Sequence, residues 1–230
     1  MSKLLILNCD YDTAPETNGA QLIRARILHD GSHKVRIESA FSYGGIPASA
    51  LNWCDAAVIT GSRASTYERK RWVRNLQSVI RRLDGAAKPV LGICFGYQIV
   101  AAALGGRVAR GAVPEEGFKY VTLNSKGAKS PLFRGMPSRF AVYQSHNDVV
   151  TRLPAGAAPL AKSLNSLQAY SVRSFSCVQF HPEIGIATAR RMARRDGIPI
   201  SKIMGAVRSG YSLHYKVLGN FISQIDPAGL

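Results

Sequence analysis

Cys94 stands between two glycines, Gly92 and Gly96, in the pattern Gly-x-Cys-x-Gly. This is the thiol counterpart of the Gly-x-Ser-x-Gly turn, in which a strand bends sharply into a helix and exposes a nucleophile. Glycines on both sides leave room for the chain at such a bend because they carry no Cβ. The N-terminus of the following helix favours the thiolate form of a cysteine placed there. We therefore interpret Cys94 as a candidate nucleophile. The alternative is a buried cysteine in a glycine-rich turn.

A thiol nucleophile needs a base to hold its proton and a group that orients the base. His181 follows an apolar run, and Pro182 prevents a strand from continuing past it. Glu183 lies two residues beyond His181, close enough after a proline turn to hydrogen-bond the imidazole. A lone histidine at a strand end is usually only a satisfied polar residue. Combined with Cys94, however, these residues predict a catalytic triad of Cys94, His181 and Glu183, in that order along the chain.

Acyl transfer also requires N–H groups directed at the developing oxyanion. The backbone N–H of Phe95, the residue after the candidate nucleophile, would supply one. Gly61 and Ser62 follow the apolar run 56–60 and would supply the other from a loop at a strand end. Ligands bind outside the carboxyl ends of the strands in open parallel sheets, so we expect Cys94 and the Gly61–Ser62 loop on the same rim.

Strands and helices alternate over the first half of the chain, as in βαβ units with a parallel sheet. Apolar runs predict strands at 3–8, 34–39, 56–60 and 89–93, and helical spacing predicts helices at 19–30, 68–83 and after Cys94. Beyond residue 106, short runs predict strands at 108, 118–123, 140–143, 157–161, 167–172 and 175–180, followed by helices at 186–196 and about 211–225. We predict one α/β domain over 1–230: a central, mostly parallel sheet with helices on both faces and an added antiparallel β region.

Composition is that of an ordinary soluble protein, with 46% hydrophobic and 19% charged residues in 230. No apolar run approaches the roughly 18 residues of a membrane span. The N-terminal apolar segment is too short for a signal peptide, which predicts a cytoplasmic protein that contacts no membrane. The cysteines are scattered, so we expect neither disulfides nor a zinc site, and we interpret Cys9, Cys54 and Cys177 as structural.

The chain is strongly basic, with a net charge of +16. Such a surface attracts polyanions, but the basic residues are spread over several predicted helices and no nucleic-acid-binding motif is recognisable. We interpret them mainly as solvated faces. The arginines at 190, 191, 194 and 195 could dock an acidic partner. A non-catalytic module that binds nucleic acid is the remote alternative to an enzyme.

Three motifs resemble those of the class I (triad) glutamine amidotransferases: Gly-Ile-Cys-Phe-Gly-Tyr-Gln at 92–98, Ser-His-Asn-Asp at 145–148 and Gln-Phe-His-Pro-Glu at 179–183. The chain is most similar to the glutaminase subunit or domain of GMP synthetase and its stand-alone relatives. The resemblance implies a flavodoxin-like fold and a γ-glutamyl thioester on Cys94. It also implies that His181 acts as base and then as acid, oriented by Glu183.

The same resemblance implies a glutamine pocket. Gln98 and the segment containing Ser145, His146 and Asp148, expected as a loop, match positions that shape it. Glu115 and Glu116 resemble the family's acidic segment beside the pocket. The usual Gly-Gly-Pro of the oxyanion loop is replaced here by Gly-Ser-Arg at 61–63. Stand-alone relatives, including plant γ-glutamyl peptidases, also have Gly-Ser there.

These observations predict hydrolysis of L-glutamine to glutamate and ammonia, with no metal or organic cofactor. The ammonia would go to a separate ATP-dependent synthetase, since no residues remain here to build one. The alternative is a γ-glutamyl peptidase or hydrolase, which cleaves γ-glutamyl amides that carry an amine or peptide leaving group. That activity needs the same triad with a more open pocket, and Ser62 slightly favours it.

Overall fold

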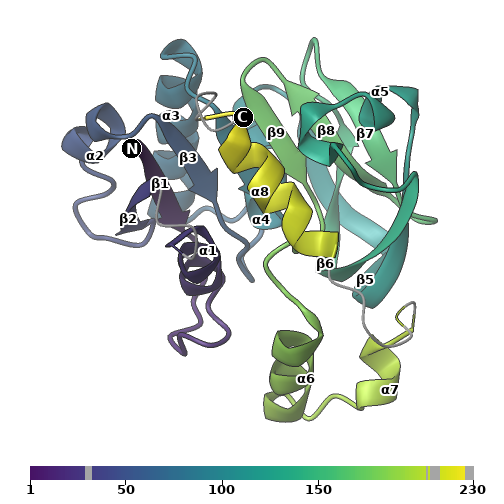
Figure 1. Ribbon diagram of the computed structural model, residues 1–230. Coiled ribbons are helices and arrows are strands. Elements are labelled where there is room, and N and C mark those ends of the chain that lie inside the picture. The colour runs from purple at the N-terminus through teal and green to yellow at the C-terminus, as the bar shows by residue number, and fades with distance from the viewer. Residues whose placement is uncertain (29–32, 206, 208–212, 226–230) are drawn as a thin grey trace.

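The computed structural model describes residues 1–28, 33–205, 207 and 213–225 (Figure 1). The strands are β1 (Ser2–Asn8), β2 (His33–Ser39), β3 (Ala56–Ile59), β4 (Val90–Ile93), β5 (Arg107–Leu123), β6 (Arg139–Arg152), β7 (Ala158–Lys162), β8 (Leu167–Val172) and β9 (Phe175–Val178). The helices are α1 (Gly19–Leu28), α2 (Ala48–Trp53), α3 (Arg71–Gly85), α4 (Phe95–Ala103), α5 (Ser125–Ala128), α6 (Ile186–Arg195), α7 (Ile200–Ile203) and α8 (Lys216–Ser223), with 3-10 turns η1 (Pro131–Phe133) and η2 (Leu213–Tyr215).

The strands form one sheet in the order β2-β1-β3-β4-β9-β8-β7-β5-β6. The five strands from β2 to β9 are parallel, and every pairing beyond β9 is antiparallel. β3 and β4 are buried along their whole length, which explains their uninterrupted apolar sequences. The predicted parallel sheet with an added antiparallel region is therefore confirmed.

Helices cover both faces of the parallel half (Figure 1). One core packs β1, β3 and β4 against α1 and α8, through Ile23 and Phe221 among others. The other core packs the opposite face of the same strands against α2, α3 and α4, through Leu76 and Phe95 among others. Two separate apolar layers thus hold the central strands, and with them the carboxyl edge of the sheet, in place.

The antiparallel half differs from the prediction. The runs predicted as separate strands at 108 and 118–123 belong to the single 17-residue β5, and the strand predicted at 140–143 continues to Arg152 in β6. Ser145–Asp148, which we expected as a loop, lies inside β6, where Ser145 pairs with Glu116 and His146 with Glu115. The hydrogen bonds between strands come from backbone groups, so polar residues can form them as well as apolar residues can. This part of β6 therefore has no hydrophobic pattern in the sequence.

The short helices α2, α5 and α7 were not predicted, because four to six residues are too few to show helical periodicity. The predicted helix at 211–225 is η2 followed by α8, and residues 211 and 212 lie outside the described part of the chain. Residues 29 and 30 of the predicted first helix also lie outside it.

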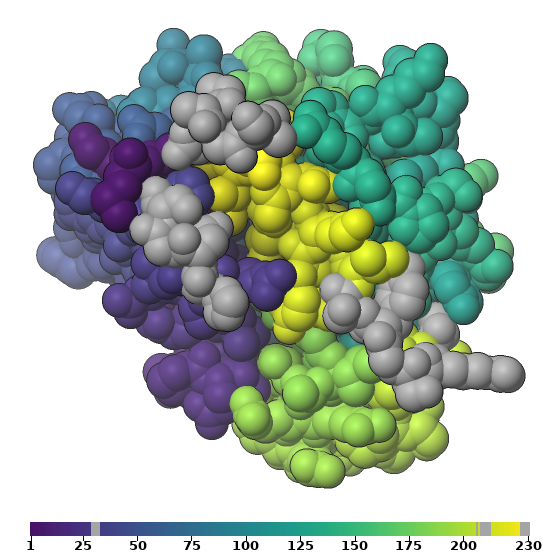
Figure 2. Space-filling model, in the orientation of Figure 1, coloured from purple at the N-terminus to yellow at the C-terminus, as the bar shows by residue number. Residues whose placement is uncertain are grey.

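α6 and α7 stand below the sheet in Figure 1 and have a core of their own. Ala189 and Ala193 of α6 pack with Phe118 of β5 and Tyr143 of β6. In Figure 2, the light-green surface of this segment abuts the purple surface of the N-terminal segment. α6 is thus placed beside the loop that follows β1. Among the described residues, no helix has the length and apolar character that a membrane crossing requires.

Candidate active site

Cys94 occupies the bend between β4 and α4 with a φ of 53° and a ψ of −102°. A positive φ is uncommon for a residue other than glycine, and such strain is concentrated at functional sites. A Cβ on Gly92 would lie 2.8 Å from the carbonyl oxygen of Gly96, and a Cβ on Gly96 would overlap the carbonyl oxygen of Ile59. Both glycines are therefore needed for close approach of the chain, and the predicted sharp turn at Cys94 is confirmed.

The thiol of Cys94 is at the first turn of α4, where backbone N–H groups have no partner within the helix. The N–H of Phe95 is one of these groups. The Sγ atom lies 3.8 Å from the carbonyl oxygen of Ser145 in β6, and the residue is 4% exposed. The sulfur is covered by neighbouring strands and yet borders two pockets, described below.

His181 and Glu183 lie beside this thiol, as the sequence predicts. Nδ1 of the imidazole is 2.7 Å from Oε1 of Glu183, and the backbone N–H of His181 donates to the carbonyl oxygen of Tyr143 at 2.9 Å. Burial acts to lower the pKa of His181. The charges and hydrogen bonds of Cys94 and Glu183 outweigh burial and raise that pKa well above its usual range. The surroundings therefore favour the imidazolium form of His181.

Gly61 brings the loop after β3 against both groups. A Cβ on Gly61 would lie 2.9 Å from Cε1 of His181 and 3.6 Å from Cβ of Cys94. Ser62 follows it, and its Oγ accepts a hydrogen bond from the N–H of Ala64 at 3.1 Å, which closes a tight turn. The structure thus places Gly61, Ser62 and Phe95 around the thiol, where oxyanion donors are expected.

One pocket that borders Cys94 lies over the paired strands β5 and β6, and we call it the β5–β6 pocket. All six residues predicted to bind substrate line it: Gln98, Glu115, Glu116, Ser145, His146 and Asp148. Arg110 and Arg63 add two guanidinium groups to the same wall. This pocket therefore combines both signs of charge beside the sulfur.

Two of these residues are engaged with the protein. Nε2 of Gln98 donates to the carbonyl oxygen of Asp148 at 3.0 Å and to Oε1 of Gln179 at 3.2 Å. Glu115 is buried, and its Oε2 accepts from Ser166 Oγ at 2.5 Å and from Gln168 Nε2 at 3.1 Å. These contacts fix the floor of the pocket, so the two side chains shape it from below.

His146 and Asp148 are also buried. Nε2 of His146 is 3.6 Å from Oε2 of Glu115, whose charge acts to raise the pKa of the imidazole. Burial dominates, however, and lowers the pKa of His146 to about 4. The imidazole is therefore neutral at neutral pH. Oδ1 of Asp148 accepts a hydrogen bond from the hydroxyl of Tyr67 at 3.0 Å.

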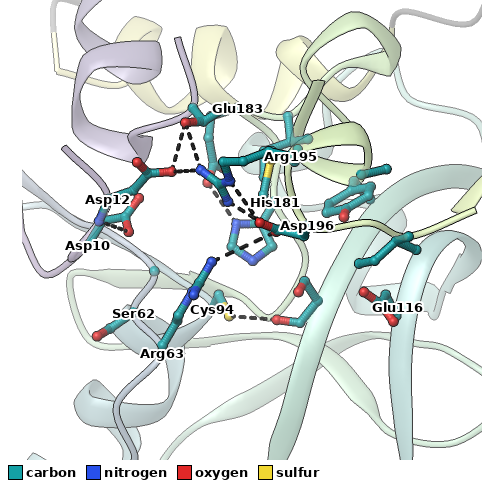
Figure 3. A pocket seen from close by; sticks show the side chains of 18 residues that line it. Asp10, Asp12, Ser62, Arg63, Cys94, Glu116, His181, Glu183, Arg195 and Asp196 are labelled. Carbon is teal, nitrogen blue, oxygen red and sulfur yellow. Dashed lines mark hydrogen bonds and ion pairs between the residues drawn. The ribbon is translucent and has the colours of Figure 1, made fainter. Parts of the chain in front are cut away.

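A second pocket borders Cys94 on the side of His181, between α6 and the loop after β1 (Figure 3). We call it the α6 pocket. Its walls include Asp10 and Asp12 from the loop, and Met192, Arg195 and Asp196 from α6 and its end. None of these residues was predicted from the sequence to line a site beside Cys94, although Arg195 was expected on a docking surface. Asp10 and Asp12 directly follow a parallel strand, so the rule that located Gly61 could have found them.

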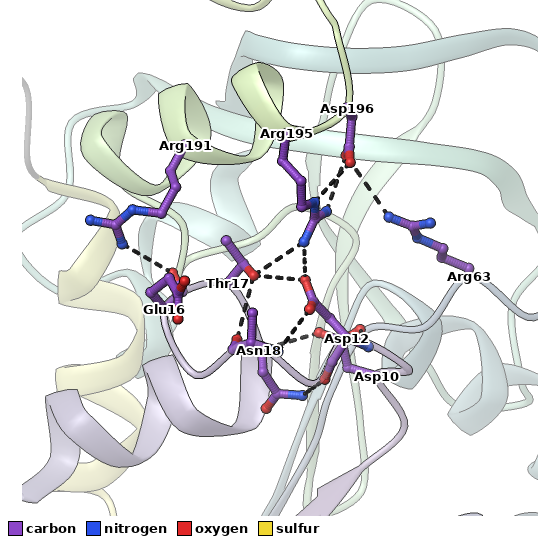
Figure 4. Close-up of polar contacts among 11 residues, drawn as sticks. Asp10, Asp12, Glu16, Thr17, Asn18, Arg63, Arg191, Arg195 and Asp196 are labelled. Carbon is purple, nitrogen blue, oxygen red and sulfur yellow. Dashed lines mark hydrogen bonds and ion pairs between the residues drawn. The ribbon is translucent and has the colours of Figure 1, made fainter.

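Ion pairs join the two walls of the α6 pocket (Figure 4). Arg195 pairs with Asp12 across the pocket and with Asp196 beside it at 2.8 Å. Arg63, in the loop after β3, lies 3.9 Å from Asp196. Arg195, which we expected as part of a docking surface for an acidic partner, is thus held by acidic residues of its own chain.

Each of the four cysteines is a free, buried thiol. Burial raises the pKa of Cys177 to about 12, consistent with the structural role that we predicted for it. Within the described ranges, no group of three or more His, Cys, Asp or Glu side chains is arranged to hold a metal ion.

Residues 31–197 match the family described as glutamine amidotransferase class-I. The chain belongs to this family. Among solved structures, a glutamine amidotransferase from Thermotoga maritima superimposes with a TM-score of 0.79 at 20% identity, covering 97% of each chain. That match confirms the predicted fold, the flavodoxin-like fold of class I glutamine amidotransferases.

Three relatives show which members of this enzyme family the chain is similar to. It is 36% identical over 131 residues to γ-glutamyl peptidase 4 of Arabidopsis thaliana, covering 55% of this chain and 52% of the relative. It is 30% identical over 203 residues to a γ-glutamyl-L-1-hydroxyisopropylamide hydrolase of Pseudomonas sp., covering 80% and 69%. It is 39% identical over 113 residues to the glutamine-hydrolyzing GMP synthase of Lactobacillus delbrueckii subsp. bulgaricus, covering 46% and 22%. The match thus spans about half of the plant relative and about a fifth of the GMP synthase.

Proposed function

We propose that this protein hydrolyses the side-chain amide of L-glutamine to glutamate and ammonia, through a γ-glutamyl thioester on Cys94. One observation carries the proposal: a thiol on a strained bend lies beside an imidazole whose Nδ1 is held 2.7 Å from a buried carboxylate. A nucleophile, a base and a group that orients the base are the parts that covalent amide hydrolysis requires.

In the first half-reaction, the Cys94 thiolate attacks the amide carbon. The negative charge moves to the carbonyl oxygen, which the N–H of Phe95 and the Gly61–Ser62 loop stabilise. The C–N bond then breaks as His181 gives its proton to the departing nitrogen. Ammonia leaves, and the γ-glutamyl group remains as a thioester with Cys94.

In the second half-reaction, the neutral His181 takes a proton from water as the water oxygen attacks the thioester carbon. The C–S bond breaks, glutamate leaves, and the thiolate and imidazolium are restored. Glu183 keeps Nδ1–H directed toward itself, so Nε2 is the nitrogen that exchanges the proton. It also stabilises the imidazolium, in line with the raised pKa of His181.

The β5–β6 pocket suits the glutamyl part of the substrate. Its α-ammonium group would pair with the carboxylates of Glu116 and Asp148, and its α-carboxylate with the guanidinium group of Arg110. Gln98 and Glu115 act by holding the pocket floor through the hydrogen bonds described above. Similarity to the GMP synthases supports a further step, in which the ammonia passes to a separate ATP-dependent synthetase.

A γ-glutamyl amide hydrolase is the second candidate. The relative with the widest coverage of this chain among those described above is named for that activity, and the plant relative is named a γ-glutamyl peptidase. The same thioester forms in both reactions, and only the leaving amine differs. The two candidates therefore share every step at Cys94, His181 and Glu183.

The direct test is to measure ammonia and glutamate released from L-glutamine by the purified protein, and to trap the acylated enzyme by acid quench followed by peptide mass spectrometry. We expect a γ-glutamyl adduct on Cys94 and loss of turnover in Cys94→Ala. Cys54→Ala removes a different buried thiol and serves as the control. Turnover that survives in Cys94→Ala would contradict the proposal.

A further inference from the structure

The two pockets beside Cys94 have five lining residues in common and then diverge. The residues that line both are Ser62, Arg63, Cys94, Glu116 and Ser145. Gln98, His146 and Asp148 line only the β5–β6 pocket, whereas His181 and Glu183 line only the α6 pocket. The sulfur therefore lies at a junction, with the imidazole on one side of it alone.

The position of His181 on one side of the sulfur indicates which pocket would hold each part of a substrate. The general acid must reach the nitrogen that leaves, so the leaving group departs on the side of His181. The acyl part then extends the other way, into the β5–β6 pocket. The α6 pocket is consequently where a group attached to the departing nitrogen would lie.

The α6 pocket has more lining groups than a leaving ammonia molecule could contact. Ammonia has one heavy atom, but the pocket extends past the imidazole to apolar side chains of Tyr143, Ile184, Met192 and Ile198. In Figure 3, Asp10 and Asp12 form one wall of the pocket, with Arg195 and Asp196 on the other. Such a wall of apolar and carboxylate groups suits an alkyl chain that ends in a hydrogen-bond donor.

The charge of the α6 pocket opposes that of the whole chain. It contains five carboxylates, on Asp10, Asp12, Glu116, Glu183 and Asp196, against the two guanidinium groups of Arg63 and Arg195 and the imidazolium of His181. Both guanidinium groups are already paired with carboxylates of the pocket. The pocket lining is therefore negatively charged, whereas the protein as a whole has a net charge of +16.

Two carboxylates keep free capacity for a donor. Oε2 of Glu183 is buried and has no hydrogen-bond partner, while Oε1 holds His181. Asp10 accepts N–H bonds from Gly19 at 2.9 Å and from Asp12 at 3.0 Å, but forms no ion pair with any described residue. Burial raises the pKa of Asp10, and the nearby charges of Asp12 and Glu183 add to the effect. A cation in the pocket would relieve that repulsion.

We propose that the α6 pocket binds the leaving amine, and that the preferred substrate is a γ-glutamyl amide whose amine carries a second, positively charged nitrogen on a short alkyl chain. This inference rests on the proposed chemistry at Cys94 and deepens it. The steps are those given above, with the substituted amine in place of ammonia. The C–N bond breaks, the proton of His181 goes to the amine nitrogen, and water later releases glutamate.

Three γ-glutamyl amides of equal chain length test the charge preference. Their unbranched alkyl chains end in an ammonium, a methyl or a carboxylate group, and L-glutamine is the reference. We expect kcat/KM to fall from ammonium to methyl to carboxylate, by about tenfold at each change of terminal charge. Equal kcat/KM values for the three amides, or a preference for the carboxylate, would overturn the inference.

Three variants test whether the α6 pocket causes this preference. Asp10→Asn should reduce the ratio of kcat/KM for the ammonium amide to that for the methyl amide by about tenfold, whereas Glu16→Gln should leave this ratio unchanged. Glu16 is exposed in the same loop and does not line the pocket, so it is a matched loss of one charge. Met192→Trp fills the pocket without changing charge, and should reduce turnover of all three amides relative to glutamine. An equal loss for glutamine and the amides would contradict the assignment.

Failure of the inference is distinguishable from failure of the proposed function. If the protein turns over glutamine through an adduct on Cys94 but shows no dependence on the terminal charge, only the role of the α6 pocket is wrong. If neither glutamine nor any amide is hydrolysed and Cys94 carries no adduct, the proposed function itself is wrong.

Discussion

Arg195 and Asp12 lie 183 residues apart in the sequence and form an ion pair across the α6 pocket. Nε of Arg195 also binds Asp196 at 2.8 Å. One guanidinium group thus connects the end of α6 to the loop after β1. Two contacts hold α6 at the wall of the α6 pocket: this ion pair, and the apolar cluster in which Ala189 and Ala193 pack with Phe118 and Tyr143.

Arg195→Ala should therefore loosen α6 without unfolding the protein. The guanidinium group is partly exposed, and such ion pairs contribute at most about 1 kcal/mol to global stability. We expect faster amide hydrogen exchange in residues 186–195 and an unchanged rate in β3 and β4. Arg173→Ala removes a similar exposed pair, with Asp84, at a distant position and should leave exchange in α6 unchanged. Uniformly faster exchange over the sheet would contradict this expectation.

Glu183→Gln should lower kcat by about 10³- to 10⁴-fold, because the imidazole loses the carboxylate that fixes its tautomer and stabilises its charge. The carboxylate also helps to raise the pKa of His181, so its removal should lower that pKa. NMR titration of the His181 imidazole in the wild type and in Glu183→Gln measures this. Glu38→Gln, on the edge strand β2, is the control, and an unshifted His181 pKa in Glu183→Gln would argue against the pairing.

Parts of the fold and of the site could be predicted where the residues that determine them lie close together in the sequence. The bend at Cys94 could be predicted because Gly92, Gly96 and the change in apolar spacing lie within a few residues. His181 and Glu183 could be paired because Pro182 leaves them close together. The position of Ser145–Asp148 within β6 could not be predicted, because these polar residues find their strand partners in β5, at Arg110, Glu115 and Glu116.

The α6 pocket was missed for a different reason. Its two walls come from opposite ends of the chain, and nothing local to Asp12 or Arg195 indicates that they meet. Gln98 lines the β5–β6 pocket, but its amide binds the carbonyl oxygen of Asp148 and the side chain of Gln179. Long-range contacts of this kind are set by the topology of the sheet, which single-sequence patterns do not specify.

His214 should make the protein less stable in acid. Burial lowers the pKa of this imidazole to about 4, and the charge of Arg26 adds to the effect. Its folded pKa is below the unfolded value of about 6.5, so stability is fully present above about pH 6.5 and is lost as pH falls toward about 4. The loss attributable to His214 should be about 2 kcal/mol between pH 7 and pH 5. Urea unfolding of the wild type and of His214→Phe at both values measures it, and an equal loss in the two proteins would refute this assignment.

Gly96→Ala should destabilise the protein by a few kcal/mol and abolish turnover, because the new Cβ would overlap the carbonyl oxygen of Ile59. Relief of that overlap requires α4 to move away from β3, which displaces Cys94 from Gly61 and His181. Gly219→Ala is a matched control: Gly219 is exposed in α8, and a Cβ there meets no atom within 4 Å. The control should gain up to about 1 kcal/mol from helix propensity. Thermal or urea unfolding, combined with ammonia release from glutamine, compares the two variants, and a stable, active Gly96→Ala protein would show that the bend at Cys94 tolerates a side chain.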